Sequence, residues 1–323
     1  LQYQEGEDTI YKVIDKYWLV QEEPNNVFTA IGSATVMDDS PFWKISKDEG
    51  FTFNGNNEVI TGIVYEDNPL SWELNGFVPA LSPTFSTSSG ALVTVNDITF
   101  TGAGYAVLIG HDSRNNKFDD GSYWHGDLHA DRGVQNSVVN NLKVINLQAF
   151  SFSIVACCGM ACFGTGEYNN VEVYGTTRHP YDSSSATRVL DVVAANNSKN
   201  TYNNCKFGTM YSQSNVYSKF YGCEIDFLHI SATTSSATVI GAGTVVKELR
   251  LGGGYLRPDG TIEDPVYTSG CTIKAGATVN VLDLSKLTNK GANVVVEDGA
   301  IIKKILHGGN EYSSWAEFKA SLQ

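Results

Sequence analysis

From about residue 90 the chain repeats a short pattern of apolar and polar positions. A large apolar residue is followed by Asn or Tyr, then by a turn-prone residue, then by an apolar-polar-apolar triplet. A triplet of this kind alternates between two faces when it forms a strand. Asn adopts left-handed backbone conformations readily and bonds its own backbone, so it suits a tight corner before each strand. The repeats are Val95–Phe100, Val139–Val144, Tyr168–Val173, Tyr202–Phe207 and Phe220–Ile225.

A single strand of this kind cannot bury its apolar face, but a stack of them can. The pattern therefore predicts an all-β fold, a single-stranded right-handed parallel β-helix (solenoid) whose loops vary in length while its corners are kept. The matched apolar positions should then point into one core and stack in line. These positions are Ile98, Leu142, Val171, Cys205 and Cys223.

The repeats resemble the right-handed parallel β-helix of the pectin-lyase-like superfamily over roughly residues 90–305. Phage tailspikes and many polysaccharide-active enzymes share this architecture. The Gly-rich alternation of Val239–Leu251, Cys271–Leu284 and Ala292–Leu306 is similar to that of autotransporter passengers and related surface adhesins. The resemblance implies an extracellular, cell-surface or virion-associated protein that meets glycans.

The two ends of the chain differ from the repeats. Residues 1–80 are interpreted as an N-terminal cap or small subdomain, 81–310 as the β-helix and 311–323 as a short C-terminal capping helix. Ile10, Val13, Ile14 and Tyr17 have helical spacing, which predicts a short amphipathic helix, with a strand as the alternative. A terminal cap would cover strand edges that are otherwise open to other chains.

Composition supports this interpretation and limits the partners. Of the 323 residues 42% are hydrophobic and 18% charged, and Gly occurs 31 times, which is typical of turn-rich β proteins. A net charge of −13 argues against nucleic acid and anionic membranes. The apolar runs are far shorter than the ~20 residues of a spanning helix. The six cysteines are expected to be small buried apolar residues, not a disulfide framework.

The stretch from Trp124 to Arg132 carries the most chemistry. If it is a strand, His125, Asp127, His129 and Asp131 share one face, while apolar and small residues face the other way. Neighbours in this row lie ~7 Å apart, so one substrate could contact two of them. A solvated polar face is the alternative interpretation.

A second strand precedes each Asn corner at similar distance. These strands should stack as one sheet, made of 124–131, about 151–157, about 187–193 and about 214–219. Asp191 would then face outward near the His/Asp row, with Arg188 near the start of its strand. Arg178 and His179 belong to a polar loop that could project over the same sheet.

The segment 111–123 is an insertion before this stretch and is rich in oxygen ligands. Asp112, Asp119 and Asp120 are of the kind that Ca²⁺ prefers, although the spacing is not that of an EF-hand. A calcium site is therefore a hypothesis, and a solvated turn is the alternative.

The His/Asp row suggests action on a polysaccharide. Hydrolysis needs two carboxylates flanking the bond, and Asp127 with Asp191 is the pair that neighbouring coils could bring together. Elimination needs a base such as His125 or His129, and a cation to neutralise a uronate. The candidate catalytic residues are His125, Asp127, His129, Asp131 and Asp191. The candidate substrate-binding residues are Trp124, Arg132, Arg178, His179 and Arg188.

Two functions from different classes follow. The first is an extracellular polysaccharide-recognising protein with glycan hydrolase or lyase activity at the His/Asp site on the outer face of the sheet. The second is a non-catalytic surface adhesin or fibre-type binding protein. The partner in either case is a polysaccharide or cell-surface glycan. A monomer is favoured, and a trimer is the alternative that tailspike-like proteins suggest.

Overall fold

The computed structural model describes the greater part of the chain, with gaps. The described residues are 2–5, 8–12, 19–36, 44–47, 49–62, 83–87, 90–104, 106–110, 136–153, 156–180, 188–194, 198–212, 216–231, 238–253, 269–287 and 290–323. Strands cover most of these residues, and the helix among them lies close to the C-terminus. The fold is all-β, as the alternating patterns predict.

Antiparallel strands open the described chain. They are β1 (Gln2–Glu5), β2 (Asp8–Lys12), β3 (Leu19–Glu23) and β4 (Val27–Ala30), each paired with the next. The helix predicted from Ile10 to Tyr17 is therefore wrong at its start, and residues 13–18 lie outside the described part. Strand β2 is paired along both edges, and such tertiary pairing overrides a weak helical spacing.

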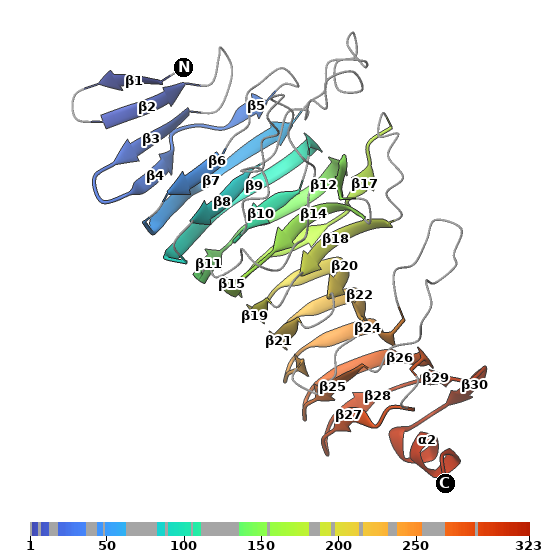
Figure 1. Ribbon diagram of the computed structural model, residues 1–323. Helices are drawn as coiled ribbons and strands as arrows, with labels where there is room; N and C mark the ends of the chain where they lie inside the picture. Colours follow the sequence, from blue (N-terminus) through green and yellow to red (C-terminus); the bar gives the residue numbers. More distant parts are fainter. Residues whose placement is uncertain are drawn as a thin grey trace, which may run out of the picture.

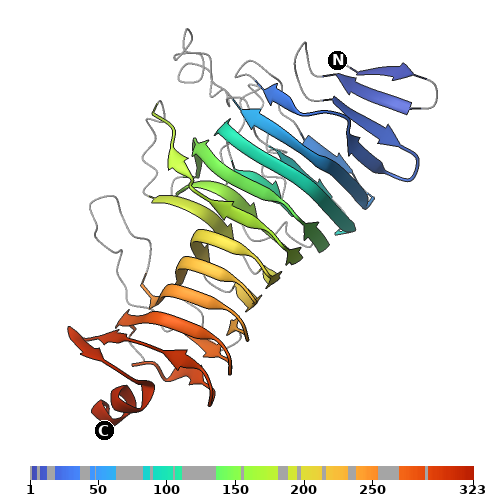
Figure 2. The same cartoon turned by 180° about the vertical axis from the view of Figure 1, so that it is seen from behind.

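Parallel stacking begins at β4, within the region predicted as a cap. Strand β4 pairs with β7 (Phe51–Gly62), which pairs in turn with β9 (Leu92–Gly104). Each later strand stacks on its equivalent in the next coil, and the result is an elongated parallel β-helix (Figure 1). The view from behind shows the N-terminal strands and the C-terminal helix at opposite ends of the stack (Figure 2).

Three ladders of strands form the sides of the solenoid. The first begins with the first halves of β7 and β9 and continues through β11 (Asn136–Asn140), β15 (Thr165–Asn169), β19 (Lys199–Asn203), β21 (Tyr217–Tyr221), β23 (Val239–Ile240), β25 (Gly270–Ile273) and β27 (Asn293–Val296). The second begins with the second halves of β7 and β9 and continues through β12 (Lys143–Ala149), β16 (Glu172–Tyr174), β20 (Lys206–Ser212), β22 (Glu224–Ile230), β24 (Val245–Gly252), β26 (Thr278–Lys286) and β28 (Ile301–Ile302).

The third ladder combines separate strands with the second halves of β20, β22, β24 and β26. Its separate strands are β6 (Lys44–Lys47), β8 (Thr84–Thr87), β10 (Val107–Ile109), β14 (Ala156–Cys162), β18 (Arg188–Ala194) and β29 (Ile305–His307). Within β20 the core residues Phe207 and Met210 are three positions apart, not two, because the strand bends between the second and third ladders. Short strands complete the set: β5 (Ala34–Val36), β13 (Ser151–Ser153), β17 (Thr177–Arg178) and β30 (Asn310–Tyr312).

The predicted stack of second strands is confirmed at one member and corrected at two. Strand β18 fits the stretch predicted at about 187–193, but its parallel partner β14 begins only at Ala156, later than the stretch predicted at about 151–157. Residues Ser151–Ser153 form β13, which pairs antiparallel with β14. The stretch 214–219 does not join β14 and β18, because β21 belongs to the first ladder and pairs with β19 and β23. The next strand of the third ladder is the second half of β20.

A residue with positive φ turns each coil from the first ladder into the second. These corner residues are Asn57, Asp97, Asn141, Asn170, Asn204, Gly222, Gly243, Gly276 and Gly299. Asn and Gly adopt this conformation at low cost. Just before the corners, amide side chains hydrogen bond from coil to coil over 2.9–3.0 Å; they belong to Asn54, Asn96, Asn140, Asn169 and Asn203.

The core fills the inside of the coils. Ile98, Leu142, Val171, Cys205 and Cys223 are all buried in it and follow the corner residues of successive coils, which confirms the predicted stack. Tyr168, Tyr202 and Phe220 stack face to face along the axis, with ring centroids 5.0 Å apart at each step. All six cysteines are buried, as expected.

A short helix, α2 (Trp315–Ser321), follows the last strands and confirms the predicted C-terminal helix. The Ser314 hydroxyl accepts a hydrogen bond from the Glu317 backbone N–H, and the Glu317 carboxylate accepts one from the Ser313 N–H in return. This reciprocal capping fixes the start of the helix. Phe318 is fully buried and packs against His307 and Tyr312.

Candidate functional site

The His/Asp row and its neighbours lie outside the described residues. This applies to the candidate catalytic residues His125, Asp127, His129 and Asp131, to the candidate binding residues Trp124 and Arg132, and to the candidate calcium ligands Asp112, Asp119 and Asp120. Their roles stay predictions. The described candidates are Arg178, His179, Arg188 and Asp191.

Asp191 is buried at the bend between the second and third ladders, with 5% of its surface exposed. One carboxylate oxygen accepts a hydrogen bond from the Thr176 N–H at 2.8 Å, and the other accepts from the Thr209 N–H at 2.7 Å. The Thr209 hydroxyl donates to the second oxygen as well, at 3.1 Å. A Cβ on Gly208 would collide with this carboxylate, so Asp191 also explains why position 208 is Gly.

His179 and Arg188 are also buried, on different parts of the fold. The His179 ring stacks on Phe150, with centroids 4.2 Å apart, and its backbone N–H donates to Ala149 at the end of β12. Arg178 ends the neighbouring strand β17. Arg188 begins β18, and its guanidinium lies 5.1 Å from the Tyr211 ring centroid.

A row of side chains that the sequence analysis missed crosses the outer face of the third ladder. Register pairing places Tyr211, His229, Arg250 and Asp283 opposite one another on four successive strands. The row therefore runs along the solenoid axis, whereas the predicted row ran along one strand. Its signal is present in the sequence, because each member lies seven residues after a corner residue: 204, 222, 243 and 276.

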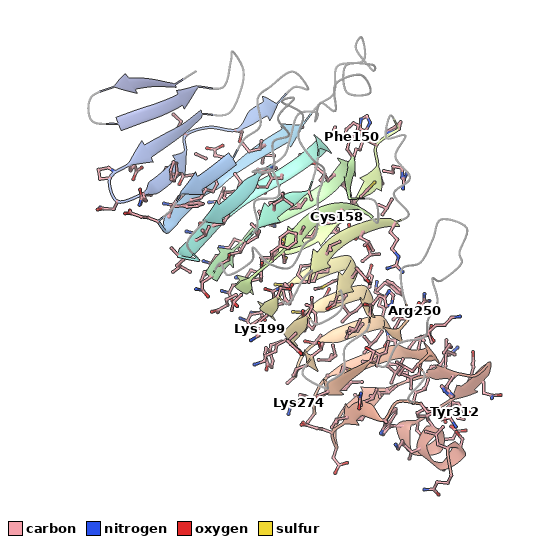
Figure 3. The ribbon with its side chains drawn as sticks, in the orientation of Figure 1. Phe150, Cys158, Lys199, Arg250, Lys274 and Tyr312 are labelled. Carbon is pink, nitrogen blue, oxygen red and sulfur yellow. The ribbon has the colours of Figure 1, made fainter. Side chains whose placement is uncertain are left out.

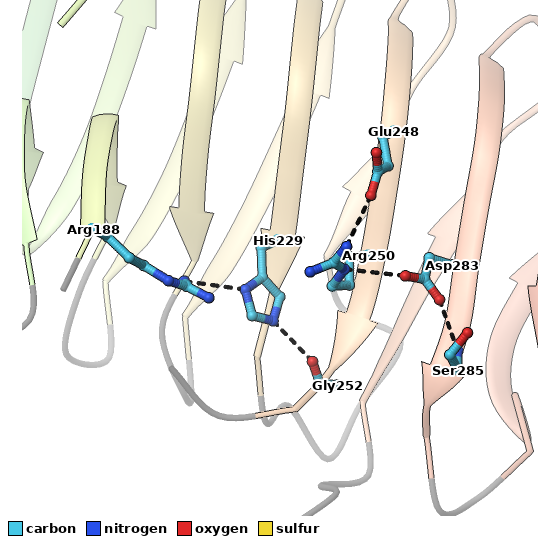
Figure 4. A network of polar contacts seen from close by, with 7 residues as sticks. All are labelled: Arg188, His229, Glu248, Arg250, Gly252, Asp283 and Ser285. Carbon is cyan, nitrogen blue, oxygen red and sulfur yellow. Dashed lines mark hydrogen bonds and ion pairs between the residues drawn. The ribbon is translucent and has the colours of Figure 1, made fainter. Parts of the chain in front are cut away.

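His229 is the best-defined group of this row (Figure 4). Its Nδ1 lies 3.3 Å from an Arg188 guanidinium nitrogen, and its Nε2 lies 2.8 Å from the Gly252 carbonyl oxygen. A guanidinium can only donate, so Nδ1 is the acceptor and Nε2 carries the proton. Burial, reinforced by the Arg188 charge, lowers the pKa of His229 from 6.5 to about 3. At neutral pH the ring is uncharged and both nitrogens are engaged, so it is a structural link and not a general base.

Arg250 joins the other half of the network. Its guanidinium bonds Asp283 and Glu248, at 3.1 Å in each case, and lies 5.2 Å from the Phe227 ring centroid. Asp283 in turn accepts a hydrogen bond from the Ser285 N–H (Figure 4). The Arg250 cation is thus paired with two carboxylates. Such pairing is expected when charged side chains are partly buried.

A groove of about 350 Å³ lies on the adjoining face, over the second ladder. Strands β16, β20, β22 and β24 supply its lining, so that it crosses four successive coils. The lining residues are Tyr174, Lys206, Phe207, Gly208, Glu224, Ile225, Asp226, Val245 and Lys247. Gly208 lies between Tyr174 and Asp226, its register neighbours on either side, and the Asp191 carboxylate occupies the space where a Cβ of Gly208 would stand.

The polar side chains of the groove are exposed surface groups, unlike those of the third ladder. The Lys206 ammonium lies 5.2 Å from the Tyr174 ring centroid. Lys247 pairs with Asp226 at 2.7 Å, and both side chains are more than half exposed. Exposed pairs of this kind contribute only ~0–1 kcal/mol, so a ligand can replace them at little cost.

The outer surface is charged on more than one side. Lys199 and Lys274 project from one long side of the solenoid and Arg250 from the opposite one (Figure 3). Among the described residues, no cluster of three His, Cys, Asp or Glu side chains is placed to hold a metal ion, and no helix is long and apolar enough to cross a membrane. The chain was compared with family models, with curated proteins and with solved structures. None of them matches it.

Proposed function

We propose that this chain is an extracellular polysaccharide-recognising β-helix protein, and that the groove over the second ladder is its binding site. The observation that carries the proposal is the shape and lining of that groove. Of its two aromatic lining residues Phe207 is buried in the core, so the Tyr174 ring is the aromatic surface beside Gly208 and four charged side chains that can bond hydroxyl groups. Sugars combine an apolar ring face with a rim of hydroxyls, and a ring beside hydrogen-bonding groups matches both.

The groove has the length and direction for a chain-like ligand. It crosses four coils, and strands stack about 4.8 Å apart, so its length along the axis is roughly 14 Å. One coil repeat is comparable to one pyranose unit of an extended glycan. A linear polysaccharide would therefore lie along the solenoid axis, meeting the same two outward positions on each successive strand.

Lys206 is expected to move when the ligand binds. Its ammonium covers one face of the Tyr174 ring, a contact that contributes only about 0.5–1 kcal/mol at an exposed site. A sugar can take this place on the ring, while the ammonium turns to a ligand oxygen. The resemblance to the pectin-lyase-like superfamily supports the same ligand class, but it is an analogy of fold, and folds host many functions.

The second candidate function is a non-catalytic adhesin or fibre-type protein, and the described site favours recognition over cleavage. The buried carboxylates Asp191 and Asp283 are held by backbone or Arg250 donors, and His229 is occupied on both sides. In the catalytic alternative, cleavage is assigned to the His/Asp row outside the described residues, and Ca²⁺ bound by Asp112, Asp119 and Asp120 neutralises the uronate. A monomeric, cell-surface or virion-associated protein remains the proposed context.

A glycan array followed by assays for new reducing ends and for unsaturated uronate products tests the proposal. Binding without either product signals the adhesin-type function, new reducing ends alone signal hydrolysis, and both signals together indicate elimination. Absence of any bound glycan at high protein concentration would contradict the proposal.

For the catalytic branch, Asp127→Asn and His129→Ala should each lower cleavage at least ~100-fold, because an acid or base is lost. Binding in the groove and the free energy of unfolding should change little, since exposed polar positions usually shift stability by less than ~0.5 kcal/mol. Cleavage that survives both substitutions would show that the row is only a solvated face.

A further inference from the structure

Two of the six cysteines stand apart from the others, because they occupy equivalent positions of neighbouring coils. Lys206 of β20 is paired in register with Glu224 of β22, so the preceding residues, Cys205 and Cys223, lie one above the other. The Glu224 N–H donates to the Cys205 carbonyl oxygen at 2.9 Å, which fixes this stacking at the backbone level. The pair sits at the corner, where the first ladder turns into the second.

Both thiols point toward the preceding coil, so the Cys223 thiol is directed at the coil that carries Cys205. Each donates to a carbonyl oxygen of the preceding coil, Cys205 to Tyr168 and Cys223 to Tyr202, at 3.3 Å in both cases. Burial raises the pKa of Cys205, and the interaction with the Cys205 side chain lowers the pKa of Cys223. Cys223 is therefore the sulfur of the pair that more readily becomes a thiolate, the nucleophile of thiol–disulfide exchange.

The other cysteines have no such arrangement. Cys157 and Cys158 are consecutive, and the first faces the main core while the second belongs to a separate apolar cluster. Cys162 is paired in register with Ile109 and Ala194. Cys271 stacks on Thr238 and Val294, the register neighbours that follow from the pairing of β25 with β23 and β27.

The Cα separation of Cys205 and Cys223 suits a disulfide. Opposed residues of neighbouring parallel strands lie about 4.8 Å apart. This falls inside the ~4.4–6.8 Å Cα separation that a disulfide spans.

We infer that Cys205 and Cys223 form a cross-coil disulfide when the chain folds in an oxidising compartment. The Cys223 thiolate attacks a small-molecule disulfide and releases one thiol from it. The Cys205 thiol then loses its proton and displaces the second thiol from the mixed disulfide. In total the pair loses two protons and two electrons and gains one S–S bond, and the small-molecule disulfide is reduced to two thiols.

The bond would fasten the two coils that supply the middle of the groove. Cys205 and Cys223 directly precede Lys206 and Glu224, the outward residues of those coils. The loop it closes is short, so it forms early in folding and limits the unfolded chain. The thiols are buried once the coils are stacked, so oxidation belongs to the folding step.

Peptide mapping gives the direct test, because trypsin separates the two residues. The full chain is refolded with oxidised glutathione, its remaining thiols are alkylated in denaturant, and it is digested without reduction. Cleavage after Lys199, Lys206, Lys219 and Lys247 places Cys205 in peptide 200–206 and Cys223 in peptide 220–247. The inference predicts a cross-linked pair of these two peptides that separates on reduction. Full alkylation of both cysteines would overturn it.

Thermal unfolding gives a second readout that does not depend on peptide recovery. Reductant should lower the unfolding midpoint of the oxidised wild type by several degrees. It should have no effect on Cys205→Ala or Cys223→Ala. Cys271→Ala, which removes a buried thiol outside the pair, should keep the sensitivity of the wild type. Equal sensitivity in all four proteins would also overturn the inference. Neither readout involves a glycan, so failure here leaves the proposed function untouched.

Discussion

The surroundings of His229 decide its chemistry. They show why a histidine in the sequence, such as the predicted base His125 or His129, does not by itself identify a catalytic group. An unperturbed histidine titrates near neutrality, which is why the sequence suggests a base. In the fold, His229 is buried between Arg188 and the Gly252 carbonyl, and its pKa falls to about 3. The same residue type thus becomes a neutral hydrogen-bond bridge. Asp191, a candidate catalytic carboxylate, is likewise occupied by backbone and threonine donors at a bend.

The lowered pKa of His229 predicts an acid-sensitive stability. Between pH 6.5 and about 3 the unfolded chain binds a proton at this residue and the folded chain does not. Stability is therefore complete above pH 6.5 and is lost as the pH falls through this window. The loss is ~1.4 kcal/mol per pH unit, or about 2 kcal/mol by roughly pH 5. Chemical denaturation at these two pH values measures it.

The matched variant is His229→Gln, which does not titrate. It should be less stable than the wild type at neutral pH, but its free energy of unfolding should fall less on acidification, by about the amount given above. Carboxylates contribute the same background in both proteins. An identical pH dependence in wild type and variant would show that His229 is not held neutral.

At the level of elements, the corners of the coils define the fold. The N-terminal coils use Asn and Asp with positive φ, and the later coils use Gly. Beside the Asn corners, stacked amides add a ladder of side-chain hydrogen bonds, in which Asn169 donates to Asn140 and accepts from Asn203. Each amide in this ladder satisfies the next, so the loss of one member leaves two neighbours short of a partner.

Asn169→Ala should therefore destabilise the protein by about 1–3 kcal/mol, through two partly buried amides that lose a partner. The control is Asn136→Ala, an exposed residue of the same ladder of strands whose amide makes a 3.1 Å bond to the Gly90 carbonyl oxygen. That change should cost less than ~1 kcal/mol. Urea unfolding midpoints compare the two, and equal costs would show that the amide ladder adds nothing to stability.

The corners also explain what the sequence could predict. Asn141, Asn170 and Asn204 mark the same structural position, and the apolar residue after each corner faces the core, so fold class and core alignment follow from the pattern. The helix predicted near Ile10 fails because a spacing of four residues cannot report pairing along both edges of a strand.

The outward rows were missed for a different reason. Outward side chains of successive coils are recognised as neighbours only when their positions are counted from the corner residue of each coil. Three of these corner residues are glycines, Gly222, Gly243 and Gly276, and no Asn marks them in the sequence. Insertions between the second and third ladders, as between β16 and β18, break the count in earlier coils. Proximity along one strand therefore suggested the site at residues 124–131, whereas Tyr174 and His229 depend on stacking between coils.

At the scale of the whole molecule, the β-helix converts a one-dimensional repeat into long outer faces. Stacking repeats two outward positions per ladder in each coil, so the second ladder offers a regular outer surface, and the groove lies on it across four coils. The chain carries a net charge of −13, but the groove combines two lysines with two carboxylates. A hydroxyl-rich ligand suits such a balanced site better than a strongly charged one.

The affinity of the best array glycan for wild type and for two tyrosine variants tests the central claim most directly. Tyr174→Ala removes the aromatic ring of the groove, and Tyr221→Ala removes a 39% exposed tyrosine from the first ladder, on another side of the solenoid. Titration calorimetry should show a loss of at least ~10-fold for Tyr174→Ala, equivalent to about 1.4 kcal/mol, and none for Tyr221→Ala. Equal affinities for all three proteins would contradict the placement of the glycan site in this groove.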